Sequence, residues 1–196
     1  MNYHQKSAFF LLLFVSFSLA GCLPFTDFTN EESEQVKVTC LVDGRPFEAV
    51  NGEGLFAVDF VRTELVDEET YFLLTVFGGE LLDDGAALAV GFRLGGDNLA
   101  DLQEGDTFDN WELDENDGAH KGVMGGVEQR PSANSDEHDF RASSNHTGDV
   151  SLTITSIDHV SKKISGEFHF TALDNENNVR VEISEGKFEN IYWGKE

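Results

Sequence analysis

VSLTITSIDHVSKKISGEFHFTA, residues 150–172, decides the fold of this chain. Apolar and polar side chains alternate over residues 150–157, and the same alternation returns over residues 164–172. Successive side chains on a β-strand point to opposite faces, so a period of two predicts a strand with one buried face. The polar residues 158–163 between the two parts predict a turn. The stretch therefore predicts an antiparallel hairpin.

The two-residue period continues on both sides of this hairpin. Asp43-Gly44 predicts a tight turn between strands at residues 36–42 and 45–50. Further strands are expected at residues 55–61, 71–77, 86–94, 179–183 and 187–193, with shorter ones around 107–113, 122–128 and 139–142. Residues 98–103 predict one helical turn. We predict a single all-β domain over residues 36–196, an antiparallel β-sandwich of about ten strands, with a β-barrel as the alternative.

The first 21 residues have the composition of a secretory signal peptide. Lys6 precedes the apolar run AFFLLLFVSFSLA at residues 8–20, which is too short for a permanent membrane-spanning helix. The run leads into L-A-G-C at residues 19–22, which resembles the lipobox of bacterial lipoproteins. In that family the peptide is cut before the cysteine, here between Gly21 and Cys22. The cysteine sulfur then carries a diacylglycerol, and the new amino terminus is often acylated too.

We therefore expect a signal peptide over residues 1–21, lipid attachment at Cys22, and a flexible tether over residues 22–35. The tether is polar and shows no periodicity. Two or more lipid chains hold a protein stably on a bilayer, because each buried methylene contributes ~0.8 kcal/mol. The resemblance implies a place in the bacterial cell envelope. Leu23 follows the cysteine where Asp would signal inner-membrane retention, which favours the outer membrane.

The composition restricts the class of partner. Thirteen Lys and Arg stand against 37 Asp and Glu, for a formal net charge of -24. This balance argues against nucleic acid, whose phosphates require basic residues to neutralise them. With Cys22 lipidated, Cys40 has no partner for an internal disulfide. Cys40 alternates in phase with Val38 and Val42, which predicts a buried thiol.

The segment from residue 148 to residue 188 resembles the ending of a family of uncharacterised bacterial lipoproteins. That ending has a strand of alternating Thr and Ile, an Asp-containing turn, I-S-G-x-F-x-F-T-A and then G-K-F. Residues 164–172 and 186–188 match the last two parts, and V-D-G-x-x-F at residues 42–47 is similar to the family's opening. The resemblance implies a lipid-anchored domain of unknown function and brings no active site with it.

The matched residues read as structural. Phe168 and Phe170 share one strand face, so we expect both rings in the core. Gly166 and Gly186 are typical of turns or bulges.

Trp111 is the best candidate for a ligand contact. It lies near Asp109, Asn110 and Asp114, and an indole beside Asp and Asn is what a sugar site uses for stacking and for hydrogen bonds at the ring edge. The other interpretation, which we favour, is that Phe108, Trp111 and Leu113 simply cover a sheet edge.

No motif in the chain predicts a metal centre or a cofactor. His120, His138, Asp139 and His146 are candidate metal ligands, but their spacing fits no zinc pattern. Residues 114–118 and 174–178 offer oxygen ligands for weak Ca²⁺ binding, although neither has the spacing of an EF-hand. The sequence also lacks a nucleophile elbow, a phosphate loop and a dinucleotide fingerprint, which argues against an enzyme.

Three functions follow from these observations. The first is a lipid-anchored envelope module that binds a protein or glycan ligand. The second is a structural or assembly component, which predicts an exposed apolar patch or an unprotected edge strand. The third is a polysaccharide hydrolase, which requires two carboxyl groups facing one cleft, one of them with a raised pKa. We rank the hydrolase last.

Overall fold

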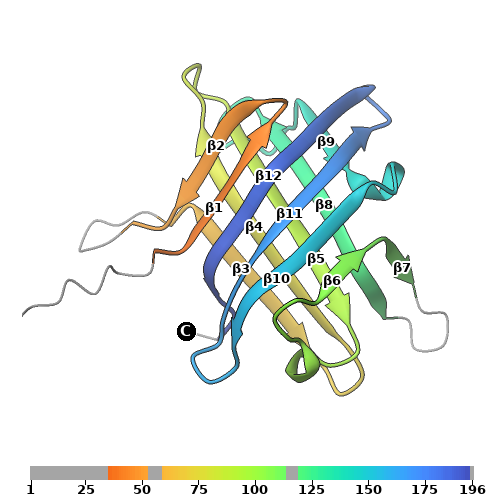
Figure 1. Ribbon diagram of the computed structural model, residues 1–196. Helices are drawn as coiled ribbons and strands as arrows, with labels where there is room; N and C mark the ends of the chain where they lie inside the picture. Colours follow the sequence, from red (N-terminus) through yellow and green to blue (C-terminus); the bar gives the residue numbers. More distant parts are fainter. Residues whose placement is uncertain (1–34, 53–58, 114–118, 195–196) are drawn as a thin grey trace, which may run out of the picture. The chain divides into compact units, whose positions relative to one another are not determined.

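The structure is a computed structural model that describes residues 35–52, 59–113 and 119–194 (Figure 1). These residues all belong to one compact unit, residues 32–196. The predicted signal peptide, Cys22 and nearly all of the predicted tether lie outside the described residues. Within the described ranges, no helix is long and apolar enough to cross a membrane.

The described residues form twelve strands and two short 3-10 turns. The strands are β1 (Lys37–Val42), β2 (Arg45–Val50), β3 (Val61–Asp67), β4 (Phe72–Leu81), β5 (Ala87–Gly96), β6 (Thr107–Asp109), β7 (Trp111–Leu113), β8 (His120–Arg130), β9 (Phe140–Ser143), β10 (Val150–Asp158), β11 (Lys163–Asp174) and β12 (Val179–Tyr192). The 3-10 turns are η1 (Leu99–Asp101) and η2 (Ser144–His146). The predicted all-β class is confirmed, and η1 lies inside the predicted helical turn.

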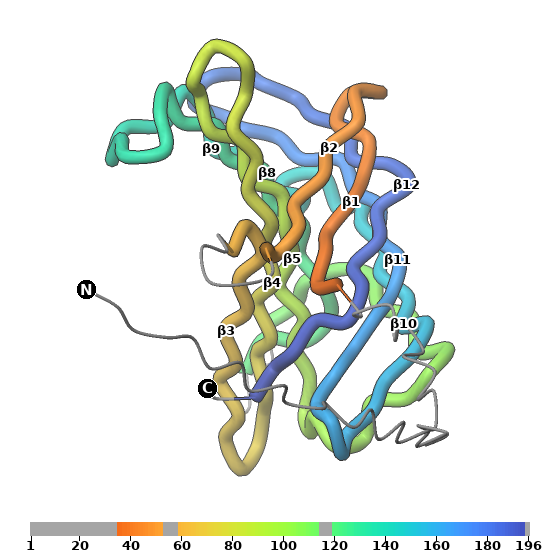
Figure 2. The backbone as a smooth tube through the Cα atoms, turned by 90° about the vertical axis from the view of Figure 1, so that its left-hand side faces the viewer, coloured from red at the N-terminus to blue at the C-terminus, as the bar shows by residue number. Residues whose placement is uncertain are grey.

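All strand pairs are antiparallel, in the order β2-β1-β12-β11-β9-β8-β5-β4-β3. Off this path, β10 pairs with β11, β6 with β10 and β7 with β8. The sheet folds over so that β1, β12, β11 and β10 form one layer and β3, β4, β5 and β8 the other (Figures 1 and 2). A single bridge between Asn51 and Asp59 links the two edge strands, β2 and β3, and the described sheet is not closed into a barrel. The sandwich-like layering agrees with the prediction.

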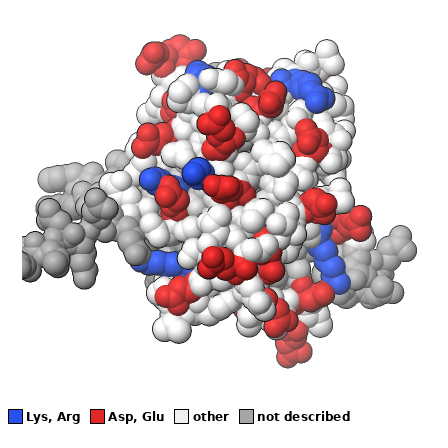
Figure 3. Space-filling view, viewed as in Figure 1, with Lys and Arg blue, Asp and Glu red and all other residues white. Residues whose placement is uncertain are grey.

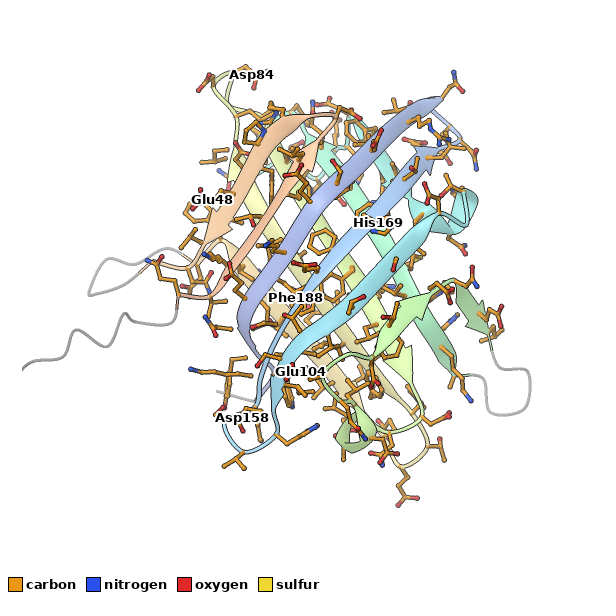
Figure 4. The ribbon with its side chains drawn as sticks, in the orientation of Figure 1. Glu48, Asp84, Glu104, Asp158, His169 and Phe188 are labelled. Atoms are coloured by element: carbon orange, nitrogen blue, oxygen red, sulfur yellow. The ribbon has the colours of Figure 1, made fainter. Side chains whose placement is uncertain are left out.

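Aromatic rings fill the space between the two layers. The ring centroid of Phe92 on β5 lies 4.8 Å from that of Phe188 on β12 and 5.7 Å from that of Phe168 on β11. Figure 4 shows Phe188 between the layers. Phe170 and Cys40 are buried as predicted, and Cys40 is 5% exposed. Removing this apolar surface from water is the main favourable contribution to the fold.

Two glycines make room for these rings. Gly166 on β11 lies opposite Phe188, and Gly186 on β12 lies opposite Phe168. A Cβ added to Gly166 would stand 2.4 Å from the Phe188 ring, and one added to Gly186 would stand 2.7 Å from the Phe168 ring. The β11–β12 register also shifts beside Gly166, as the bulge prediction requires. The motif therefore has a packing role, with each phenylalanine covering the glycine on the neighbouring strand.

The strand boundaries differ from the prediction in three places. Most of the strand expected at residues 55–61 lies outside the described residues, and β3 begins at its last residue, Val61. The strand expected at residues 107–113 is divided at Asn110. The two strands expected at residues 179–193 are one strand, β12, because Glu185 (φ 52°) forms an irregularity within it and not a turn.

Candidate functional site

Trp111 lies on β7, and its indole stacks on a histidine. The ring centroids of Trp111 and His120 are 4.9 Å apart, with 9° between the ring planes. Trp111 is half-buried, whereas Asp109 and Asn110 are exposed. Asp114, the fourth residue of the predicted sugar site, lies outside the described residues. Asp109 ends β6 and Trp111 begins β7, so these residues are neighbours along the chain, and the proposed sugar contact stays a prediction.

Asn110 has a structural role at a corner of the chain. Its φ of 56° turns the chain from β6, which pairs with β10, to β7, which pairs with β8. The Asn110 carbonyl oxygen accepts a hydrogen bond of 2.7 Å from the Val123 N–H. Opposite, Gly122 has a φ of +90°, and a Cβ there would stand 2.4 Å from that carbonyl oxygen. Asn110 therefore fixes a connection between the two layers.

The candidate metal ligands make separate contacts. The His138 Nδ1 atom lies 3.1 Å from Glu128 Oε1, the His146 Nδ1 atom lies 2.9 Å from the Leu173 carbonyl oxygen, and His120 stacks on Trp111. Over the described ranges, no three His, Cys, Asp or Glu side chains are grouped so that they could hold a metal ion. The acidic stretch 114–118 lies outside those ranges.

Asp174 anchors the turn between β11 and β12. Its buried carboxylate accepts hydrogen bonds from the Asn177 side chain at 2.8 Å, from the Arg141 N–H at 3.0 Å, and from the N–H groups of Asn177 and Glu176. These bonds, foremost that of the Asn177 side chain, lower the pKa of Asp174 to about 2. The Asp174 oxygens, two of those that the sequence offered for calcium, thus fix this turn to β9.

A surface furrow of about 1120 Å³ lies over the outer face of β4, β5 and β8. We call it the β5 furrow. This face is turned away from the viewer in Figure 1. Its floor consists of small residues on the outer face of these strands: Gly79, Ala87, Ala89, Gly91 and Gly126. Neither this furrow nor a second groove along β3 is lined by Trp111.

Strand register explains why a depression forms here. Ala89 lies opposite Gly79 on β4, and Gly91 lies opposite Gly126 on β8, so small residues are adjacent across three strands. Larger apolar side chains rise around them and form the walls: Phe60, Phe77, Leu81 and Met124. Phe60 and Leu81 are 40% and 57% exposed, so the furrow offers apolar surface to a ligand.

Four of the six arginines in this acidic chain line the β5 furrow: Arg62 on β3, Arg93 on β5, Arg130 on β8 and Arg141 on β9. Figure 3 shows the opposite face, over β1, β10, β11 and β12, where acidic side chains outnumber basic ones. The furrow also holds three acids, Asp59, Glu80 and Glu128, so its lining has a small excess of positive charge on a protein of net charge -24. A local excess of positive charge favours anions.

Two of these arginines are held by one carboxylate, Glu128. Arg130 donates to Glu128 through Nε, and the Arg141 Nε lies 3.1 Å from Glu128 Oε2. Burial raises the pKa of Glu128, but the hydrogen bond from Arg130 and the charges of Arg130, Arg141 and His138 outweigh it and lower the pKa. Glu128 therefore stays ionised at neutral pH and neutralises part of this end of the furrow.

The other two arginines, Arg62 and Arg93, have no acidic partner within ion-pair distance among the described residues. Apart from Glu128, the acids of the furrow are Glu80, whose Oε1 lies 3.2 Å from Arg45 Nη1, and Asp59, whose backbone forms an isolated β-bridge with Asn51. Arg62 and Arg93 are exposed, so both guanidinium groups are available to an anionic ligand.

Sequence reasoning missed the β5 furrow. The signal was present, since each of these arginines occupies an outward position of a strand, but the four strands are neighbours only through the sheet order. In A-L-A-V-G, residues 87–91, the outward residues are small and, taken alone, indicate only a weak strand former. They indicate a depression only once their small partners on β4 and β8 are known.

No curated protein and no solved structure matches this chain. Residues 123–192, which run from β8 to the end of β12, match the model of a family described as a Domain of unknown function (DUF6252). The match includes the paired glycines and phenylalanines of β11 and β12, and Glu128 with the two arginines that it holds, Arg130 and Arg141.

 

Of the nine floor and wall residues of the β5 furrow, two, Met124 and Gly126 on β8, lie inside the match. The furrow residues on β3, β4 and β5 precede it. The matched family therefore covers the aromatic–glycine core and one side of the furrow, and its description assigns no activity.

Proposed function

We propose that this chain is a lipid-anchored protein of the bacterial cell envelope whose β domain binds a ligand in the β5 furrow. The L-A-G-C stretch at residues 19–22 supports the anchor, with Cys22 as the lipidated residue. The single observation that carries the binding role is the furrow itself, a concave, largely apolar surface with four arginines on an acidic protein.

A hydrolase has less support than a binding module. Polysaccharide hydrolysis requires a pair of carboxyl groups, one of which keeps its proton near neutral pH. In the furrow, Glu128 is ion-paired with a lowered pKa, and Glu80 is paired with Arg45. These acids serve to balance arginines, which suits recognition of a ligand better than proton transfer.

The anchor is tested by growing bacteria that express the full chain with labelled palmitate. We expect the label to appear in the protein and to be absent from a Cys22→Ser variant. Label in both chains, or in neither, would remove the lipid anchor from the proposal.

The binding role is tested by thermal unfolding of the Cys22→Ser chain against a panel of organic acids, alcohols and glycans. A ligand that binds only the folded state raises the unfolding temperature. The nearest atom to a Cβ at Gly126 is 3.8 Å away, so a Gly126→Phe side chain has room to project into the furrow and block it. We expect this variant to lose the shift, and a Glu48→Phe control on the outer face of β2 (Figure 4) to keep it. A shift that survives Gly126→Phe would place the ligand elsewhere.

A further inference from the structure

The arginines at the two ends of the β5 furrow differ in how far acidic side chains neutralise them. The two ends therefore differ in their preference for an anionic group. Glu128 holds Arg130 and Arg141 at one end. Arg62 and Arg93 have no acidic partner within ion-pair distance among the residues described. An anionic group is therefore favoured at Arg62 and Arg93, and a second anionic group at the far end would meet the Glu128 carboxylate.

Strand register places these two arginines beside the apolar floor. Arg93 is two residues beyond Gly91 on β5, so it stands on the same outer face at the end of the row of small residues. Arg62 lies opposite Phe77, which in turn lies opposite Gly91. The cationic groups thus flank one end of a surface whose remainder is small and apolar.

The length of the furrow limits the size of the apolar part of a ligand. From Ala87 to Arg93 the outer face of β5 extends about 20 Å, at roughly 3.3 Å per residue. Along this path Phe60 and Leu81 expose apolar surface that a hydrocarbon chain would cover.

Resting on the proposed function, we propose that the ligand is a single-chain amphipathic carboxylate. Its hydrocarbon chain lies over Ala87, Ala89 and Gly91, and its carboxylate is bound by Arg62 and Arg93. A guanidinium group presents parallel N–H donors that match a carboxylate, and these charge-assisted hydrogen bonds are stronger than neutral ones.

The test is calorimetric titration of the Cys22→Ser chain with three probes: hexadecanoate, hexadecanol and butyrate. Hexadecanoate should bind most tightly, because hexadecanol lacks the charge and butyrate lacks the long chain. An Arg62→Gln, Arg93→Gln double variant should bind hexadecanoate about tenfold to a hundredfold more weakly and hexadecanol unchanged. Arg180→Gln, an exposed arginine of β12 outside the furrow, is the matched control and should bind hexadecanoate as the parent chain does.

Equal affinity for hexadecanoate and hexadecanol, or hexadecanoate affinity that the double variant leaves intact, would overturn the carboxylate inference. The Gly126→Phe variant separates this failure from failure of the proposed function. If Gly126→Phe abolishes binding while the arginine changes do not, the furrow binds a ligand of another class. If Gly126→Phe has no effect on any bound probe, the furrow is not the binding site and both proposals fail.

Discussion

At the scale of single residues, phenylalanine rings packed over glycines join β11 to β12. Gly166 lies under Phe188 and Gly186 lies under Phe168, so each strand contributes one ring and one space. All four residues fall within the region that matches the family model. The pattern quoted from the sequence is thus explained by packing and carries no chemistry of its own.

Adding one methyl group tests this packing. A Cβ on Gly166 would stand 2.4 Å from both the Phe188 ring and the Thr153 carbonyl oxygen, so Gly166→Ala should lower the free energy of unfolding by about 1–3 kcal/mol. Gly126→Ala is the control, because its Cβ would make only an ordinary contact, 3.8 Å from the Ala142 carbonyl oxygen, and should change stability by at most about 0.5 kcal/mol. Urea denaturation measures both, and equal effects would show that the close contact at Gly166 is unimportant.

Cys40 gives a second prediction at this scale. Burial, with a smaller contribution from the charge of Glu80, raises the pKa of the Cys40 thiol to about 12. In the Cys22→Ser chain, a thiol reagent at pH 8 should therefore label Cys40 only as fast as the protein unfolds, and urea should speed labelling in proportion to unfolding. Rapid labelling of the native chain would show that Cys40 is accessible.

At the scale of elements, the sequence predicts a strand well where one face is buried. The hairpin expected from residues 150–172 is formed by β10 and β11, because their inward residues are strongly apolar. β3 was missed after Val61, since it is an edge strand whose inward residues Thr63 and Leu65 are only partly buried. The β5 furrow was missed for another reason, because it depends on the register between strands that are distant in sequence.

The two edge strands carry residues that discourage pairing with another sheet. β2 has Pro46 and Glu48 on its exposed side, and β3 has Arg62 and Glu64 on its exposed side and Asp67 at its end. Charges and proline at sheet edges oppose strand addition. This arrangement favours a binding role for the domain over assembly through its sheet edges.

The turn between β11 and β12 makes stability depend on pH. The folded-state pKa of Asp174 is about 2, below its ordinary value of 3.8, so the unfolded chain binds a proton at Asp174 more readily than the folded chain does. The stabilising contribution is therefore complete above about pH 4 and is lost as the pH falls towards 2. Asp174→Asn should lower the free energy of unfolding at pH 6, with a deficit that shrinks between pH 4 and pH 2.

Glu176→Gln is the control for this prediction, because Glu176 contributes only its backbone N–H to the turn. Glu176→Gln should change the free energy of unfolding only slightly at every pH from 6 to 2. A deficit for Asp174→Asn that does not vary with pH would contradict the role of the carboxylate charge.

At the scale of the whole molecule, charge is unevenly distributed over the β domain. The chain carries a net charge of -24, and four of its six arginines line one furrow. The net charge is strongly negative, whereas the arginines create one surface on which an anion is favoured. Lipidation at Cys22 would hold the protein, and with it the β5 furrow, at a membrane.

The mass of the intact chain, purified from membranes of bacteria that express it, tests most directly whether this domain is displayed from a lipid anchor. We predict a polypeptide that begins at Cys22 and carries a diacylglyceryl group on the Cys22 sulfur. A polypeptide whose Cys22 sulfur is unmodified, or one that retains residues 1–21, would contradict the account.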